Sequence, residues 1–139
     1  ALGQRVLRLA GGTPAEWSVE MTPTTVTEAR LAALRELGVT RIAQGQRFKT
    51  TAYEALLEET GLTDEQVAYM GDDVPDLPLL MRVGLSTTPA DGNPEVLNYT
   101  HWQSRFPGGR GAVRELSELI LKSQGAWDTL VHNTYVLGK

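Results

Sequence analysis

The chain is 139 residues long, 41% of them hydrophobic, and its formal net charge at pH 7 is −4. This length suits one hydrophobic core and is short for two, so we expect residues 1–139 to form a single domain. Scattered Lys and Arg residues argue against a nucleic acid or an anionic membrane surface as a partner. The chain has no cysteine, which excludes disulfides and cysteine nucleophiles and fits a reducing cytoplasm. No apolar run approaches the roughly 20 residues of a membrane span.

Short strands alternate with amphipathic helices along most of the sequence. In the first half of the chain, we expect the end of a helix at residues 2–10, a strand at 17–21, a helix at 27–37 and a strand at 39–43. A helix that Thr50 or Thr51 opens and Gly61 ends follows, and then a strand at 67–70. In the second half, we expect a short buried helix at 77–81, a strand at 85–88, a helical turn at 95–99, an edge strand at 100–104 and a helix at 112–123. This alternation favours a parallel sheet with helices on its faces. Residues 125–139 are too apolar for an unattached tail, and we expect them to dock on another surface.

A hydroxyl-rich turn, Thr-Pro-Thr-Thr at residues 22–25, follows the strand predicted at 17–21. Its hydroxyls and free amides can hold a phosphate oxygen, or they can cap the next helix, which is the commoner use of such residues. The pattern alone leaves both interpretations open.

An acidic turn follows the strand predicted at residues 67–70. Asp72, Asp73 and Asp76 crowd its carboxyl end, and no Lys or Arg lies within residues 70–80 to neutralise them. Like charges this close raise one another's pKa unless a cation joins them, and Mg²⁺ is the natural hard cation for oxygen ligands. Capping of the next helix accounts for one of these acids but not for three. The turn therefore predicts a metal or phosphate site.

Lys49 follows the strand predicted at residues 39–43, and the acidic turn follows the next strand along the chain. Because the carboxyl ends of neighbouring parallel strands meet at one edge of a sheet, we expect the ammonium group and the acids to face one cleft. A phosphate dianion needs this combination, since the metal polarises the phosphoryl group and the lysine offsets the remaining charge. Considered alone, Lys49 would be an ordinary surface lysine.

Several spaced segments then point to one family. They are Gly45-Gln46-x-x-Lys49, residues 67–78 (Val-Ala-Tyr-Met-Gly-Asp-Asp-Val-Pro-Asp-Leu-Pro), Arg82-Val83-Gly84-Leu85, Pro89-Ala90-Asp91 and residues 108–115 (Gly-Gly-Arg-Gly-Ala-Val-Arg-Glu). Over roughly residues 31–127 the chain closely resembles the 3-deoxy-D-manno-octulosonate 8-phosphate (KDO 8-phosphate) phosphatases, small tetrameric members of the haloacid dehalogenase (HAD) superfamily. The resemblance implies a HAD-like, Rossmann-type α/β fold. It also implies Mg²⁺-dependent hydrolysis of a sugar phosphate, KDO 8-phosphate, in lipopolysaccharide biosynthesis.

The resemblance assigns roles to individual residues. Asp72 matches the Mg²⁺-binding acid of the family. Asp73 matches the adjacent acid that supports the metal site, which makes it a metal-site and catalytic residue. Lys49 matches the catalytic lysine that binds the phosphoryl group. The hydroxyl of the second family motif, normally followed by glycine and arginine, has its nearest counterpart in Thr22. The family further implies a homotetramer in which the C-terminal tail, here residues 125–139, approaches a neighbouring active site.

One departure from the family pattern concerns the nucleophile. The first motif of the superfamily is an Asp-x-Asp on the central strand, in which one Asp attacks phosphorus and the other acts as general acid and base. The 139 residues contain no Asp-x-Asp. Either an N-terminal piece is absent from this chain, or the protein is a catalytically inactive HAD-like domain that serves oligomerisation, and the sequence leaves both hypotheses open.

Overall fold

The computed structural model describes residues 5–8, 17–21, 39–44 and 49–138. In this part of the chain, six strands form one sheet in the order β3-β2-β1-β4-β5-β6. The strands are β1 (Arg5–Arg8), β2 (Trp17–Met21), β3 (Val39–Gln44), β4 (Val67–Met70), β5 (Leu85–Thr88) and β6 (Trp102–Gln103). The helices are α2 (Lys49–Thr60), α3 (Leu77–Leu80), α4 (Pro94–Leu97), α5 (Ala112–Ser123) and α6 (Trp127–Val131), with 3₁₀ turns η2 (Asp64–Gln66) and η3 (Val74–Asp76) and a π-helical turn η4 (His132–Val136).

Most strand pairs are parallel, as the alternation of helices and strands predicts. β2 pairs with β3, β4 with β5 and β5 with β6 in parallel, whereas β1 lies between β2 and β4 and runs antiparallel to both. The helix expected at residues 2–10 is therefore wrong for Arg5–Arg8. So short a segment fits either a helical or a strand pattern. The hydrogen bonds from β2 and β4, both outside the segment, select the strand.

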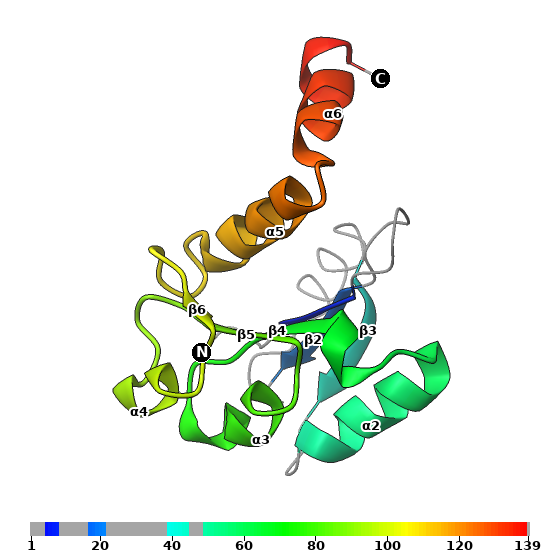
Figure 1. Ribbon diagram of the computed structural model, residues 1–139. Helices are drawn as coiled ribbons and strands as arrows, with labels where there is room; N and C mark the ends of the chain where they lie inside the picture. The colour runs from blue at the N-terminus through cyan, green and yellow to red at the C-terminus, as the bar shows by residue number, and fades with distance from the viewer. Residues whose placement is uncertain (1–4, 9–16, 22–38, 45–48, 139) are drawn as a thin grey trace.

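Strand β4 is covered on both faces. All four of its residues are buried, with Val67 and Tyr69 in one hydrophobic cluster and Ala68 and Met70 in another. The first cluster includes residues of α2, α3 and α4, and the second includes residues of α5, so helices pack on opposite sides of the sheet (Figure 1). This arrangement confirms the predicted layers and explains why β4 is an uninterrupted apolar run.

The described helices follow the predicted ones with local differences. α2 begins at Lys49, so this lysine stands in the first helical turn and not in the preceding loop. Met81 is 69% exposed and lies just after α3, which contradicts its expected place in a buried helix. The helix expected at residues 27–37 lies outside the described residues. None of the described helices is long and apolar enough to cross a membrane.

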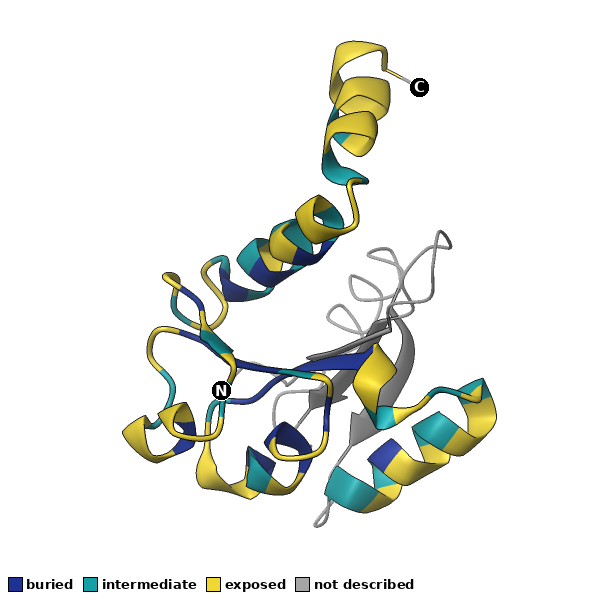
Figure 2. Cartoon of the chain, viewed as in Figure 1, coloured by how far each residue is buried: buried dark blue, intermediate teal, exposed yellow. Residues whose placement is uncertain are grey.

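The C-terminal segment extends away from the described sheet and the helices that pack on it (Figure 1). α6 and η4 continue beyond α5, and most of their surface is exposed (Figures 1 and 2). Tyr135, Val136 and Leu137 are 79%, 66% and 49% exposed. In the described part of the chain, little surface therefore covers this segment.

Candidate functional site

The acidic turn begins where β4 ends. The amide of Gly71 donates to the carbonyl of Thr87, at 3.0 Å, which holds the turn against β5. A Cβ atom on residue 71 would lie 2.6 Å from Asp76 Cβ, closer than real Cβ contacts allow. Glycine is therefore needed here because the buried Asp76 side chain passes directly over the backbone.

Asp72 presents the carboxylate best suited to a cation. Burial raises the pKa of its carboxyl group, and the negative charge of Asp76 raises the pKa further, while Lys49 partly opposes both effects. No hydrogen bond from another described residue reaches this carboxylate. A half-buried acid in this environment gains from a bound divalent cation, because the cation favours the charged form.

Asp73 is engaged differently from its neighbour. Its side chain is exposed, accepts a hydrogen bond from the Val74 amide at 2.8 Å and one from Asn93 Nδ2 at 3.1 Å, and thereby caps η3. The Val74 amide, followed by Asn93, lowers the pKa of the Asp73 carboxyl group. The capping role that the sequence allowed for one acid thus belongs to Asp73.

Asp76 is the most enclosed of the three acids, with no exposed surface. Its Oδ1 accepts hydrogen bonds from Lys49 Nζ at 2.5 Å and from the Tyr69 hydroxyl at 2.6 Å. Its Oδ2 accepts hydrogen bonds from the amides of Asp72 and Asp73 at 3.0 and 3.1 Å. The sequence showed Asp76 as a third carboxylate but gave it no separate role, since its partners are not evident from spacing along the chain.

The structure brings the predicted lysine and acids together. Lys49 starts α2, and its side chain is 17% exposed where it pairs with the buried Asp76. Lys49 thus lies beside the acidic turn, as the sequence predicted, and contacts it through the carboxylate of Asp76. Thr22 lies outside the described residues.

The acids fit a cation that needs few protein ligands. In residues 49–138, no group of three or more His, Cys, Asp or Glu side chains is arranged to hold a metal ion. Mg²⁺ keeps several water ligands and binds through one or two carboxylates together with phosphate oxygens, so Asp72 supplies the kind of ligand it uses.

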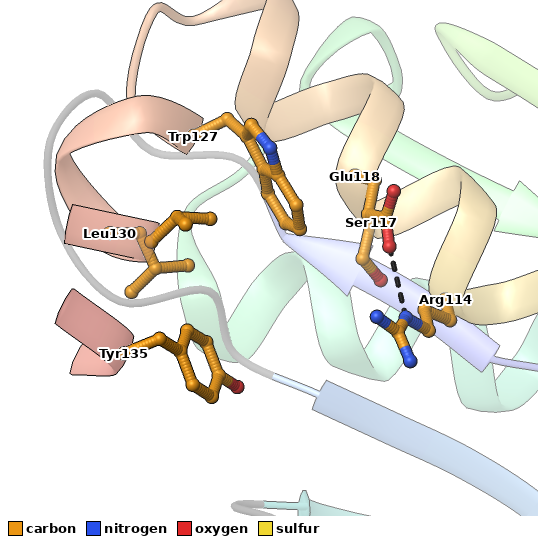
Figure 3. Close-up of a pocket in the computed structure, with 7 residues that line it drawn as sticks. Arg114, Ser117, Glu118, Trp127, Leu130 and Tyr135 are labelled. Carbon is orange, nitrogen blue, oxygen red and sulfur yellow. Dashed lines mark hydrogen bonds and ion pairs between the residues drawn. The ribbon is translucent and has the colours of Figure 1, made fainter.

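A separate cleft lies on the C-terminal segment, between α5 and α6 (Figure 3). Its volume is about 480 Å³. Its lining residues are Arg114, Ser117, Glu118, Trp127, Leu130, Val131 and Tyr135. Trp127, Leu130 and Tyr135 make it largely apolar, and the Arg114–Glu118 ion pair, 2.9 Å, forms one side. None of the three acids or Lys49 contributes to this cleft.

The fold and the arrangement of the acids on the sheet edge define a Rossmann-like α/β protein with a candidate phosphate and cation site. Residues 35–113, more than half of the chain, match the haloacid dehalogenase-like hydrolase family. The chain belongs to this family, as its sequence segments suggested.

Within this family, the chain is similar to particular phosphatases. The chain is 49% identical over 88 residues to the 3-deoxy-D-manno-octulosonate 8-phosphate phosphatase KdsC of Yersinia pestis, covering 63% of this chain and 47% of that protein. It is 41% identical over 112 residues to KdsC of Escherichia coli K12, covering 79% of this chain and 60% of that protein. The chain therefore spans about half to three fifths of the length of these relatives.

A solved structure adds the ligands that a relative binds. The 3-deoxy-D-manno-octulosonate 8-phosphate phosphatase from Moraxella catarrhalis, crystallised in complex with magnesium ion, phosphate ion and KDO, superposes with a TM-score of 0.72 at 34% identity. The superposition covers 77% of this chain and 62% of that one. The HAD-like fold predicted from the sequence is confirmed.

Proposed function

We propose that the protein containing this chain is a Mg²⁺-dependent phosphatase that hydrolyses a sugar phosphate, KDO 8-phosphate, to KDO and phosphate, as a step of lipopolysaccharide biosynthesis. One observation carries the proposal: the ammonium group of Lys49 and the backbone of the acidic turn bind the same buried carboxylate, Asp76. In this proposal, Asp72 as metal ligand and Lys49 as phosphate-binding residue would act side by side, because the same carboxylate binds the Lys49 ammonium group and the Asp72 amide. The named relatives support the choice of substrate.

Each site residue has a proposed role within that reaction. Asp72 ligates Mg²⁺, which polarises the phosphoryl group when bound. Asp73 supports the metal site by holding the turn, through its bonds to Val74 and Asn93. Lys49 binds the phosphoryl oxygens and stabilises the charge that develops on them, with Thr22 as a further phosphate ligand.

The direct test compares substrates, metals and variants of the native protein. Phosphate release from KDO 8-phosphate should exceed release from fructose 6-phosphate, and it should stop when EDTA removes divalent cations. Asp72→Asn and Lys49→Met should each abolish most activity. Asp64→Asn is the control, because Asp64 lies before β4, at the opposite end from the acidic turn. Equal release from both sugar phosphates, or full activity in EDTA, would contradict the proposal.

We further propose that residues 125–139 dock on a second copy of the chain in a homotetramer. The exposure of Tyr135, Val136 and Leu137 supports docking, because contiguous apolar surface of this kind usually marks an interface. The tetrameric state follows from the family resemblance alone. That residues 1–139 form one domain, and that the protein acts in the cytoplasm, stay predictions from the sequence.

The alternative, an inactive HAD-like domain that serves oligomerisation, predicts a different outcome of the same assay. It requires a stable oligomer without phosphate release from the native protein under any metal condition. The half-buried Asp72 carboxylate argues against it, because an inactive domain has no need to keep a charge in so costly a place.

A further inference from the structure

We propose that Asn93 is a positioning residue that holds the Asp73 carboxylate in place and thereby sets the cation affinity of the acidic turn. This inference rests on the function proposed above and extends it to a residue outside the segments that identify the family. Asn93 lies in the loop between β5 and α4 and binds two neighbouring acids. Its backbone amide donates to the Asp72 carbonyl at 2.8 Å, and its side-chain Nδ2 donates to Asp73 Oδ1 at 3.1 Å.

The orientation of the Asn93 side-chain amide follows from its second partner. Its Oδ1 accepts a hydrogen bond from the Glu95 amide at 3.0 Å and caps the N-terminus of α4. If the side chain were flipped, its NH₂ group would face the Glu95 N–H donor and its oxygen would face the Asp73 carboxylate. Two donors and two acceptors would then oppose each other. The helix cap therefore directs the NH₂ group at Asp73.

Helix α4 fixes the position of Asn93. Val96, on this helix, is completely buried in the hydrophobic cluster that also contains residues of β4 and α3. The Val96 amide donates to the Asn93 carbonyl at 3.0 Å, and Pro94 starts the helix with a restricted backbone dihedral. Asn93 thus connects the acidic turn to a helix that is packed on the sheet.

The loop reaches this position through a close approach at Gly92. A Cβ atom on residue 92 would lie 2.2 Å from Thr88 Oγ1, closer than real contacts allow. Thr88 is completely buried at the end of β5, and its hydroxyl makes no hydrogen bond with any described residue. An alanine at position 92 therefore displaces the loop, and Asn93 moves with it.

The hydrogen bond from Asn93 matters because the Asp73 side chain is exposed. The Val74 amide, 2.8 Å from Asp73 Oδ1, belongs to the acidic turn itself, whereas Asn93 reaches the carboxylate from another element. Without the Asn93 bond, the carboxylate is free to adopt more rotamers, and a cation that binds beside it must first order it. Asn93 therefore favours cation binding by fixing the direction of the Asp73 charge in advance.

Asn93→Ser separates the two uses of the side chain. Serine caps helices as well as asparagine does, so it keeps the bond to the Glu95 amide, but it has no NH₂ group for Asp73. Asn98→Ser is the matched control. Asn98 is an exposed residue at the opposite end of the same helix, and no hydrogen bond in the described part of the chain joins its side chain to the acidic turn.

The first experiment reads the position of Asp73 without a metal. In NMR spectra of the native protein in EDTA, Asn93→Ser should move the carboxyl ¹³C signal of Asp73 and the amide signal of Val74. Asn98→Ser should leave both signals in place. An unchanged Asp73 carboxyl signal in Asn93→Ser would overturn the proposal, whether or not the protein binds a cation.

The second experiment measures Mg²⁺ binding to the native protein by calorimetry. Asn93→Ser should weaken Mg²⁺ binding by about threefold to tenfold, and Asn98→Ser should change it by less than about twofold. In a protein that already carries Asp73→Ala, Asn93→Ser should have almost no further effect, because the carboxylate that Asn93 positions is gone. Equal weakening with and without Asp73→Ala, or no weakening by Asn93→Ser, would overturn the proposal.

The third experiment moves Asn93 without changing it. Gly92→Ala should weaken Mg²⁺ binding about as much as Asn93→Ser does, and adding Thr88→Ala should restore it, because this removes the Oγ1 atom that the new Cβ meets. Thr88→Ala alone should stay within about twofold of the unsubstituted protein. A double variant as weak as Gly92→Ala would overturn the proposed action of the loop through Asn93. If the unsubstituted protein binds no Mg²⁺, the proposed function fails together with the effect on affinity, and the spectra alone then decide whether Asn93 holds the Asp73 carboxylate.

Discussion

The Lys49 ammonium group lies 2.5 Å from Asp76 Oδ1, although 27 positions separate the two residues in the chain. Asp76 is completely buried, and Lys49 keeps 17% of its side chain exposed. The positive charge of Lys49 therefore lies near the protein surface, and the carboxylate of Asp76 that pairs with it lies buried beneath. The amides of Asp72 and Asp73 bind the other oxygen of the same carboxylate, so the pair also sets the position of the acidic turn.

The first prediction concerns the metal. Asp72→Asn should bind Mg²⁺ at least about tenfold more weakly than the unsubstituted chain, because an amide oxygen lacks the charge that a hard cation prefers. Calorimetric titration of Mg²⁺ into both proteins, with Asp64→Asn as the control, measures this difference. Equal affinity of Asp72→Asn and the unsubstituted chain would exclude Asp72 as the ligand.

The second prediction concerns the packing of Gly84. A Cβ atom at this position would lie 2.2 Å from the carbonyl oxygen of Glu65, and backbone atoms cannot move aside as a side chain can. Gly84→Ala should therefore lower the free energy of unfolding by about 1–3 kcal/mol. At Gly108, the nearest atom to a new Cβ, Asp91 Oδ1, is 3.6 Å away. Gly108→Ala should accordingly change stability by no more than about 0.5 kcal/mol in urea unfolding.

The third prediction concerns pH. Glu115 accepts hydrogen bonds from the Ser104 hydroxyl and from Arg105, and these partners hold the pKa of its carboxyl group below the ordinary value of 4.5. The folded state thus binds this proton less readily than the unfolded state does. The stabilisation from this group is present above pH 4.5 and is lost as the pH falls through the lower folded-state pKa.

Glu115→Gln removes that titration. The variant should be less stable than the unsubstituted chain at pH 7. The difference should shrink as the pH falls below about 4.5 and through the lower folded-state pKa, where Glu115 becomes protonated in the folded chain. Urea midpoints between pH 3 and 7 would measure both trends. Glu58→Gln, the same substitution at an exposed position of α2, serves as the control. A difference that stays constant across this range would refute the assignment.

The fourth prediction concerns assembly. If the exposed C-terminal side chains meet a second copy, then Val136→Ser combined with Leu137→Ser should shift the protein from an oligomer towards a monomer. Light scattering coupled to size exclusion at micromolar concentration measures the mass. Thr129→Ser, an exposed polar position on α6, should leave the oligomer unchanged. A monomeric unsubstituted chain would rule out the proposed interface.

The fifth prediction concerns the 139 residues by themselves. They contain no Asp-x-Asp, so they hold acids and a lysine suited to Mg²⁺ and phosphate without the nucleophile pair that HAD chemistry uses. We expect these residues alone to release essentially no phosphate from KDO 8-phosphate with Mg²⁺ present. Brisk release that Asp72→Ala abolishes would mean that another residue of this chain attacks phosphorus.

The sequence by itself determined the elements whose signals are local. The apolar run of β4, the glycine turn after it and the amphipathic helix α5 all appear where the pattern indicated, at Val67–Met70, Gly71 and Ala112–Ser123. These signals are strong because burial on a strand or on one helix face fixes the residue type at each position. The spaced sequence motifs were likewise sufficient to identify the family, because their order along the chain can be compared without knowing the fold.

Only the tertiary structure decided how those elements meet. The direction of β1 follows from its pairing with β2 and β4, which no pattern within Arg5–Arg8 encodes. The exposure of Met81 depends on where the chain leaves α3. Above all, the hydrogen bonds of Asp76 arise because strand β4, helix α2 and the acidic turn bring Tyr69, Lys49 and two amides to one buried carboxylate. Hydrogen bonds between distant segments depend on the packing of the whole sheet, and for that reason sequence spacing could show three acids but not the one that connects them.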